Sequence, residues 1–454
     1  MNESDKVDHY VNLLRQLLND TPNRSNVAEI LVLQNAIQKL AQELLNNDVK
    51  EALSRDSSIW LLCHYSIFQH YKCLLQGCTS FPVLRKNIRR NYEKCLKSAT
   101  KFYQLFIQTL IKQFDLFIDV SWLHERFLKQ LRLRTDPEIY SSLFEETDKE
   151  HVLNCVYRCL ICLGDTARYF VMCSHKDSTF RQALRSYFMA HLLFPENGYH
   201  KNQMAILYTY QNNDLETLYW LACSSSSFVP MSGAQSNLTK KLSSMQKKLK
   251  QMQKVNFSRI VALLFLLCRS NFAALQQSIY ESAAFCHIKQ NENFTSRELF
   301  MFTTLVVCLH HLKFFPWDGF ITRYLKWLIS ESINVFDMVL KEVAPLKFVK
   351  IVAPALYAAL RYVSSLGVMD TFLDKSTFHS LFSRISKLVK LFDTGLELIS
   401  LTREDSRLRV WYFTTIIPKS NCRLPNSKQI PLTDFSHLRY YRPSLTLLLK
   451  YNEH

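Results

Sequence analysis

Glycine and proline are both scarce in this chain. Only 7 glycines and 12 prolines occur among 454 residues, whereas average usage would give roughly 30 glycines. Tight hairpins and the backbone loops that cradle phosphate groups depend on glycine, because its backbone adopts positive φ angles without steric cost. The sequence therefore leaves little material for glycine-rich phosphate sites and favours long helices.

Long apolar runs are absent as well. The two most apolar stretches, residues 260–268 and 301–309, are much shorter than the roughly 18 residues of a membrane-spanning helix. No secretory signal precedes the 13 cysteines, and the chain starts with the polar stretch MNESDKVDHY, so we expect reduced thiols. We predict a protein without membrane contact that works in the cytoplasm, with shuttling to the nucleus as an open alternative.

The common signatures of catalytic and metal sites are missing too. The sequence contains no glycine-rich phosphate loop, no H-E-x-x-H pair and no serine elbow. Cys159 and Cys162 form a C-x-x-C pair, but they lie in an apolar helical pattern without a second pair, which indicates buried thiols. His310 and His311 are adjacent, so on a helix they point about 100° apart and make a poor metal pair. We predict that the protein is not an enzyme and holds no metal or cofactor.

Apolar residues recur at helical spacing along nearly the whole chain, and alternating strand patterns are rare. Leu33, Ile37, Leu40 and Leu44 show the steps of three and four residues that one face of a helix requires. Polar residues interrupt the pattern at residues 132–150, where we expect a loop between two long helices. The predicted fold class is all-α.

Three short helices are predicted between residues 179 and 228, in a pattern typical of tetratricopeptide-like hairpins. The run SSSSF, residues 224–228, predicts a surface loop. We assign residues 1–255 to a first domain that includes these helices. We expect residues 256–454 to form a C-terminal stack of α-helical hairpins with an irregular tail.

Positive charge dominates the chain, with 56 lysines and arginines against 39 acids and a net charge of +17. Five cations step by three and four residues along one predicted helix: Lys86, Arg90, Lys94, Lys97 and Lys101. The opposite face of this helix is apolar. This basic stripe could follow the phosphates of RNA or an acidic partner, and the alternative is an ordinary solvated helix face.

The string RCLICLGDTARYF, residues 158–170, carries a resemblance to a known family. It is similar to the RCL-x-x-LGD-x-x-RY signature of the nonsense-mediated mRNA decay adaptors SMG five, six and seven, a family that includes the telomerase-associated Est-one protein. Trp60 and the pair Phe102-Tyr103 upstream, and Pro195 followed by Asn202 downstream, fall where the family places similar residues. The resemblance covers roughly residues 50–250, and the chain resembles the SMG-five and SMG-seven types, which lack a nuclease domain.

The resemblance implies a 14-3-3-like domain whose concave face binds a phosphoserine peptide. Arg168 and Tyr169 occupy the positions of the family's phosphate-binding arginine and its neighbour. A guanidinium binds phosphate bidentately, and the phenol can donate one more hydrogen bond. The alternative is structural: Asp165, three residues earlier, could pair with this arginine inside a helix bundle.

One position departs from the family pattern. Tyr65 aligns where phosphate-binding members carry a lysine, so a cation is missing there. Lys72 lies seven residues later, two turns along the same helix face, and could replace it. Asn202 completes the set of predicted phosphopeptide-binding residues.

The resemblance therefore predicts a non-enzymatic adaptor in nonsense-mediated mRNA decay. Such a protein would form a heterodimer with a related SMG protein, bind the phosphorylated up-frameshift RNA helicase, and recruit decay or phosphatase factors. Two alternatives remain open. One is an Est-one-like telomerase-associated subunit that contacts RNA, and the other is a scaffold with a non-functional phosphopeptide pocket.

Overall fold

The computed structural model describes residues 3–20, 27–114, 146–174, 180–249, 296–312 and 320–341, with isolated helical positions between 355 and 387. Nearly all of these residues are helical, and within them the only β pairing is an isolated bridge between Asn197 and Val229. This confirms the all-α prediction. The chain divides into two compact units, Met1–Phe194 and Pro195–His454.

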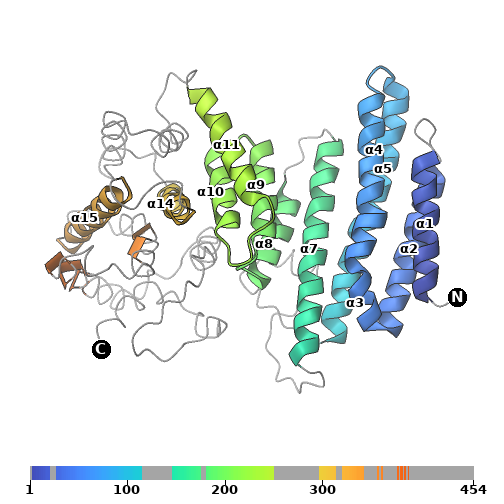
Figure 1. Cartoon of the computed structure of the whole chain (residues 1–454), viewed down its shortest axis with the longest axis horizontal. Helices are drawn as coiled ribbons and strands as arrows, with labels where there is room; N and C mark the ends of the chain where they lie inside the picture. Colours follow the sequence, from blue (N-terminus) through green and yellow to red (C-terminus); the bar gives the residue numbers. More distant parts are fainter. Residues whose placement is uncertain are drawn as a thin grey trace. The chain divides into compact units, whose positions relative to one another are not determined.

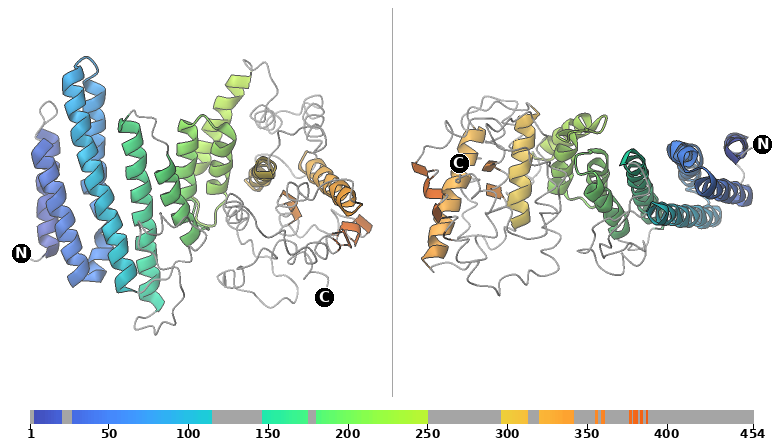
Figure 2. Two further views of the ribbon diagram at one scale, coloured as in Figure 1. Left: turned by 180° about the vertical axis from the view of Figure 1, so that it is seen from behind. Right: turned by 90° about the horizontal axis from the view of Figure 1, so that it is seen from below.

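The first unit contains seven α-helices and one π-helix among its described residues. They are α1 (Glu3–Asp20), α2 (Val27–Asn47), α3 (Val49–Ser58), the π-helix η1 (Ile59–Tyr65), α4 (Ser66–Gly77), α5 (Pro82–Gln113), α7 (Glu146–Ser174) and α8 (Arg181–Leu193). The long helices α1, α2, α5 and α7 lie side by side in chain order, as Figures 1 and 2 show. Helices α3, η1 and α4 pack along this row.

Local sequence sets where several helices begin. Asp48 caps α3, because its carboxylate accepts a hydrogen bond from the Glu51 backbone amide at 3.1 Å. Pro82 occupies the start of α5, where its fixed φ suits a helix and its missing N–H costs nothing. Asn213 caps α10 (Asp214–Ser225) in the second unit by accepting from the Glu216 amide at 3.2 Å.

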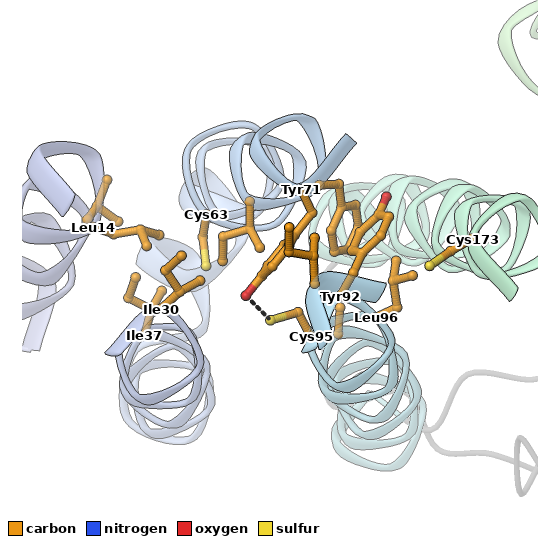
Figure 3. Packing of buried hydrophobic residues seen from close by; sticks show 14 of the residues in the cluster. Leu14, Ile30, Ile37, Cys63, Tyr71, Tyr92, Cys95, Leu96 and Cys173 are labelled. Atoms are coloured by element: carbon orange, nitrogen blue, oxygen red, sulfur yellow. Dashed lines mark hydrogen bonds between the residues drawn. The ribbon is translucent and has the colours of Figure 1, made fainter. Parts of the chain in front are cut away.

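The core of the first unit joins α1, α2, η1, α4, α5 and α7 (Figure 3). Leu14 and Ile37 fill the α1 and α2 side, while Tyr71 of α4 and Tyr92 of α5 stack with their ring centroids 5.3 Å apart. The Cys95 thiol approaches the Tyr71 hydroxyl at 4.0 Å. Burial of these large apolar side chains favours the packing of α4 onto α5.

The second unit contains α9 (Tyr199–Tyr210), α10, α11 (Ala234–Leu249), α14 (Ser296–His311) and α15 (Phe320–Leu340) among its described residues. Helix α10 packs against α9, α11 and α14, and every one of its residues except Asp214 is buried. This central position follows from sequence, because DLETLYWLACSS carries few charged groups beyond its first turn.

Two local predictions were wrong. The polar stretch 132–150 is not wholly a loop, because α7 already begins at Glu146. The serine run is not a surface loop, because Ser224, Ser225 and Ser227 are buried and donate hydrogen bonds to the carbonyls of Gly198, Leu221 and Cys223. Backbone acceptors satisfy these hydroxyls and make their burial tolerable.

Other predictions fall outside the described residues or stay predictions. The irregular tail lies outside the described residues, as does most of the region that we assigned to C-terminal hairpins. The domain boundary at residue 255 falls inside the undescribed segment 250–295 and stays a prediction, whereas the compact units divide after Phe194. The 14-3-3-like and tetratricopeptide-like descriptions of these helices also stay predictions.

Gly164 allows α7 and α8 to approach closely. A Cβ atom built at this position would overlap three ring atoms of Tyr187, each closer than real Cβ contacts permit. Tyr187 is itself completely buried. The glycine in the LGD string is therefore required by the aromatic ring that crosses it.

We expect Gly164→Ala to lower the free energy of unfolding by about 1–3 kcal/mol, because the added methyl group overpacks the contact with Tyr187. Urea denaturation monitored by circular dichroism measures the change. Gly77→Ala is the matched control, since a Cβ at Gly77 meets nothing within 4 Å, and there alanine should stabilise the helix slightly. Equal effects of the two substitutions would contradict the assigned role of Gly164.

Candidate binding site

A buried cluster of Asp165, Arg168 and Tyr187 lies at the centre of the LGDTARY string. Asp165 Oδ1 accepts a hydrogen bond from the Tyr187 hydroxyl at 2.6 Å and from Arg168 Nη2 at 2.8 Å. We call these three residues the Asp165 cluster. The ion pair that sequence analysis gave as the structural alternative for Arg168 is therefore present.

Arg168 keeps its charge in this environment. Burial disfavours the cation, but the attraction of Asp165 outweighs it and raises the pKa of Arg168. Its guanidinium carbon lies 4.5 Å from the centroid of the Tyr169 ring, a cation–π contact. Nη1 donates to none of the described groups and is not among the buried unsatisfied atoms. Among the described residues, Nη1 therefore has no hydrogen-bond acceptor.

The π-helix η1 carries two aromatic residues, Trp60 and Tyr65, that lie at one end of a chain of ring contacts leading to Tyr169. A π turn closes hydrogen bonds five residues apart, is rare, and often marks functional sites. Trp60 lies 6.2 Å from Tyr65 and 6.0 Å from Phe68, measured between ring centroids. Phe68 in turn lies 5.7 Å from Tyr169. The structure therefore connects Tyr65 with Tyr169 through continuous aromatic contacts.

A buried polar network fixes the π turn from inside. The Gln38 amide donates to His64 Nε2 at 2.9 Å, which places the ring proton on Nδ1, 2.8 Å from the Tyr103 hydroxyl. Gln38 also accepts from the Ser98 hydroxyl at 2.8 Å. Burial lowers the pKa of His64 to about 3, so this imidazole stays neutral. These hydrogen bonds connect η1 to α2 and α5.

The cations predicted to bind phosphate are placed differently from one another. Arg168 is 8% exposed, whereas Lys72 on α4 is exposed to solvent. Tyr65 stands where the family's lysine was expected and is 38% exposed. Arg168, Tyr169 and Tyr65 come together, while Lys72 follows two turns further along α4. The phosphate-binding role of these residues stays a prediction.

Asn202 belongs to α9 in the second unit. Its side chain is buried and its amide oxygen accepts a hydrogen bond from Asn237 at 3.3 Å, which joins α9 to α11. Its predicted contact with a phosphopeptide stays a prediction.

All five residues of the basic stripe lie on the exposed face of α5: Lys86, Arg90, Lys94, Lys97 and Lys101. The predicted apolar face opposite them is buried, as Ile88, Tyr92, Cys95, Ala99, Phe102 and Phe106 are all in the core. The geometry of the stripe is therefore confirmed. Its partner stays a prediction.

The described residues also bear on the catalytic and metal readings. Within them, no group of three or more His, Cys, Asp or Glu side chains is arranged to hold a metal ion. Cys159 and Cys162 are buried in α7, as predicted, and burial raises the pKa of Cys162. None of the described helices is both long and apolar enough to cross a membrane.

Sequence reasoning missed two residues that matter here. Tyr187 completes the Asp165 cluster, but it lies 22 residues away in α8 and no spacing rule connects it to Asp165. Lys201 is completely buried in α9, where its ammonium group donates to Ser227 Oγ at 2.8 Å. The sequence carries no usable signal for Lys201. Lysine is rarely buried, so its apolar and small neighbours did not predict a buried ammonium group.

The fold and the Asp165 cluster define an all-helical protein in which a buried, ion-paired arginine stays charged. Comparison with known proteins places it further. A family model described as the Est1 DNA/RNA binding domain matches residues 183–442, and one described as telomerase activating protein Est1 matches residues 54–174. The chain belongs to the Est1 family, which includes the SMG decay factors.

Relatives and solved structures agree with this assignment. The chain is 23% identical to the telomere elongation protein est1 of Schizosaccharomyces pombe, over 81% of this chain and 79% of that protein. It is 26% identical to the nonsense-mediated mRNA decay factor SMG7 of Danio rerio, over 49% of this chain and 18% of that protein.

Two solved structures share the helical fold. A chain in the crystal structure of Est1 and Cdc13 aligns with a TM-score of 0.60 and 16% identity, covering 98% of this chain and 94% of that one. A chain in the C. elegans SMG5–SMG7 complex aligns with a TM-score of 0.50 and 14% identity, covering 83% of this chain and 88% of that one.

Lys201 generates a prediction about pH. Burial lowers the pKa of its ammonium group from 10.5 to about 8. Below pH 8 the lysine is protonated in both folded and unfolded states, so the folded protein bears the full cost of a buried charge. As pH rises from 8 to 10.5, the folded state loses its proton first and the cost disappears.

We therefore expect Lys201→Met to raise the free energy of unfolding by up to about 3 kcal/mol at pH 7, and by much less at pH 10. Denaturant titrations at both pH values measure this difference. A gain of equal size at the two pH values would show that the ammonium charge is not the cause.

Proposed function

We propose that this chain is a non-enzymatic adaptor of telomere elongation, of the Est1 type. The observation that carries the proposal is the extent of the match with the S. pombe telomere elongation protein, which runs through about four fifths of both chains. Such a match takes in parts of both compact units. The SMG7 match, by contrast, takes in about half of this chain.

The geometry of the first unit supports a binding function for phosphorylated partners. Asp165 and Tyr187 hold the Arg168 guanidinium in a fixed position, so little side-chain entropy remains to be lost when an anion binds. Lys72 supplies a second, exposed cation on the neighbouring helix. A phosphorylated segment of a partner protein is the ligand that a guanidinium fork with an additional ammonium group suits best.

A second candidate is the decay adaptor that sequence analysis favoured. The likeness of the signature residues 158–170 to the decay adaptors, and the 26% identity to SMG7, support it. In that case the phosphorylated partner would be the surveillance helicase, and a related SMG protein would form the heterodimer. Telomere and decay assays separate the two candidates.

Deletion of the gene in the organism of origin should shorten telomeres progressively over generations, because an elongation adaptor would be lost. The half-life of a reporter transcript with a premature stop codon should stay unchanged. Southern blotting of terminal fragments and transcript decay curves measure the two outcomes. Stable telomeres together with a longer-lived reporter would replace the first candidate by the second.

The phosphate site is tested by fluorescence anisotropy with a phosphoserine peptide of the surveillance helicase and its unphosphorylated twin. We expect the phosphate to strengthen binding, and Lys72→Glu to remove most of that gain, because the variant places an anion beside the phosphate. Lys240→Glu, an exposed lysine of α11 in the second unit, is the control and should bind like the wild type.

Equal, weak binding of both peptides would contradict phosphate-dependent binding of the surveillance helicase by this chain. The full chain serves for all measurements. Circular dichroism spectra confirm that each variant is folded.

A further inference from the structure

The basic stripe on α5 has no ion-pair partner among the residues that the structure describes. Its five cations, Lys86, Arg90, Lys94, Lys97 and Lys101, are all exposed, and no described carboxylate lies within ion-pair distance of any of them. At 1.5 Å per residue the stripe is about 22 Å long. It thus forms a straight row of charge spaced at roughly one helical turn.

Six other cations of this protein form ion pairs within the described residues. These cations are Lys39, Arg55, Arg158, Arg168, Lys241 and Arg384. The segment around the stripe differs because it has almost no acids: residues 57–113 contain nine lysines and arginines and a single acid, Glu93. An ordinary solvated face would interleave both signs, so this distribution points to an anionic partner.

Aromatic and further basic groups flank the stripe. Lys97 Nζ lies 5.8 Å from the centroid of the Phe170 ring. Arg85 and Arg89 are half-buried beside the stripe, and the Nε atom of each is buried without a hydrogen-bond acceptor. Phe81, at the end of the α4–α5 hairpin where the stripe begins, is 62% exposed. An exposed ring next to a row of cations is the combination that single-stranded nucleic acids bind.

We propose that the outer face of the α4–α5 hairpin binds single-stranded nucleic acid. The stripe contacts successive phosphates, and Phe81 stacks on a base. This surface belongs to the first unit and lies outside residues 183–442, the segment that matches the DNA/RNA-binding model. It is therefore an additional contact for the nucleic acid that the proposed telomere function, on which this inference rests, requires.

A repeated spacing favours a nucleic acid over an acidic protein. Regular cations one turn apart suit a polymer with one charge per repeat, whereas protein acids occur at irregular intervals. Single strands also expose the faces of their bases, so Phe81 has a stacking partner that a duplex would hide.

The test is binding of the full chain to a fluorescent single-stranded RNA of about 20 nucleotides, with a duplex of the same length as comparison. The stripe variant carries Arg90→Gln, Lys94→Gln and Lys97→Gln. The control variant carries Lys6→Gln, Lys50→Gln and Lys240→Gln, which removes the same charge from exposed positions elsewhere.

We expect the stripe variant to bind single-stranded RNA at least about tenfold more weakly at low salt. Its plot of log affinity against log salt should be shallower by about 2, since each lost phosphate contact removes about 0.7 from the slope. The control variant should keep the wild-type slope. Phe81→Ala should weaken binding to the single strand about fivefold without changing the slope, and should leave duplex binding unaltered.

Three results would overturn the proposal: a stripe variant that binds like the wild type, a control variant that loses as much as the stripe variant, or a duplex that binds as tightly as a single strand whose own binding is insensitive to Phe81→Ala. Telomere length in cells that lack the gene tests the adaptor function separately. Shortened telomeres together with an unaffected stripe variant would refute the stripe alone.

Discussion

The buried carboxylate of Asp165 is the constraint on which the arrangement of α7 and α8 depends. One oxygen accepts hydrogen bonds from both Tyr187 and Arg168. A buried carboxylate or guanidinium without its partner would strongly destabilise the fold. Gly164 permits the tyrosine ring to reach this oxygen. Gly164, Asp165 and Arg168 of the LGDTARY string are therefore required for the packing of α7 against α8.

The cations of the first unit occur in two contrasting environments. In the interior, Arg168 is balanced by an acid and held in one position. On the outer face of α5, the row of cations forms no ion pair with any described carboxylate, and the cations repel one another across about 22 Å. Mutual repulsion along a helix destabilises it slightly. A face of this kind is consistent with a partner that carries the compensating charge.

Much of the helical architecture could be predicted from the sequence, because apolar spacing identifies helices wherever one face is buried. The three short helices after residue 179 and the two faces of α5 follow from this rule. The serine run was misjudged because hydroxyl groups usually mark loops, whereas here backbone carbonyls satisfy them in the core. The start of α7 was misplaced because polar residues can open a helix as readily as they form a loop.

The candidate site was only partly predictable for a different reason. Arg168 and Asp165 are three residues apart on one helix, so their contact follows from helical geometry. Tyr187, and the network of Gln38 with His64, are contacts between helices distant in sequence. Such contacts depend on how the helices cross, which a single sequence does not encode in any local pattern.

The π turn at residues 59–65 has a consequence for how this protein is compared with its relatives. A turn closed by bonds five residues apart holds one residue more than an α turn. A relative whose corresponding helix is regular would present, at the same point in space, a side chain one position away in the alignment. Whether Tyr65 is equivalent to a lysine elsewhere in the family must therefore be decided by superposing the helix axes. Counting residues from Trp60 would misalign by one position every residue that follows the π turn.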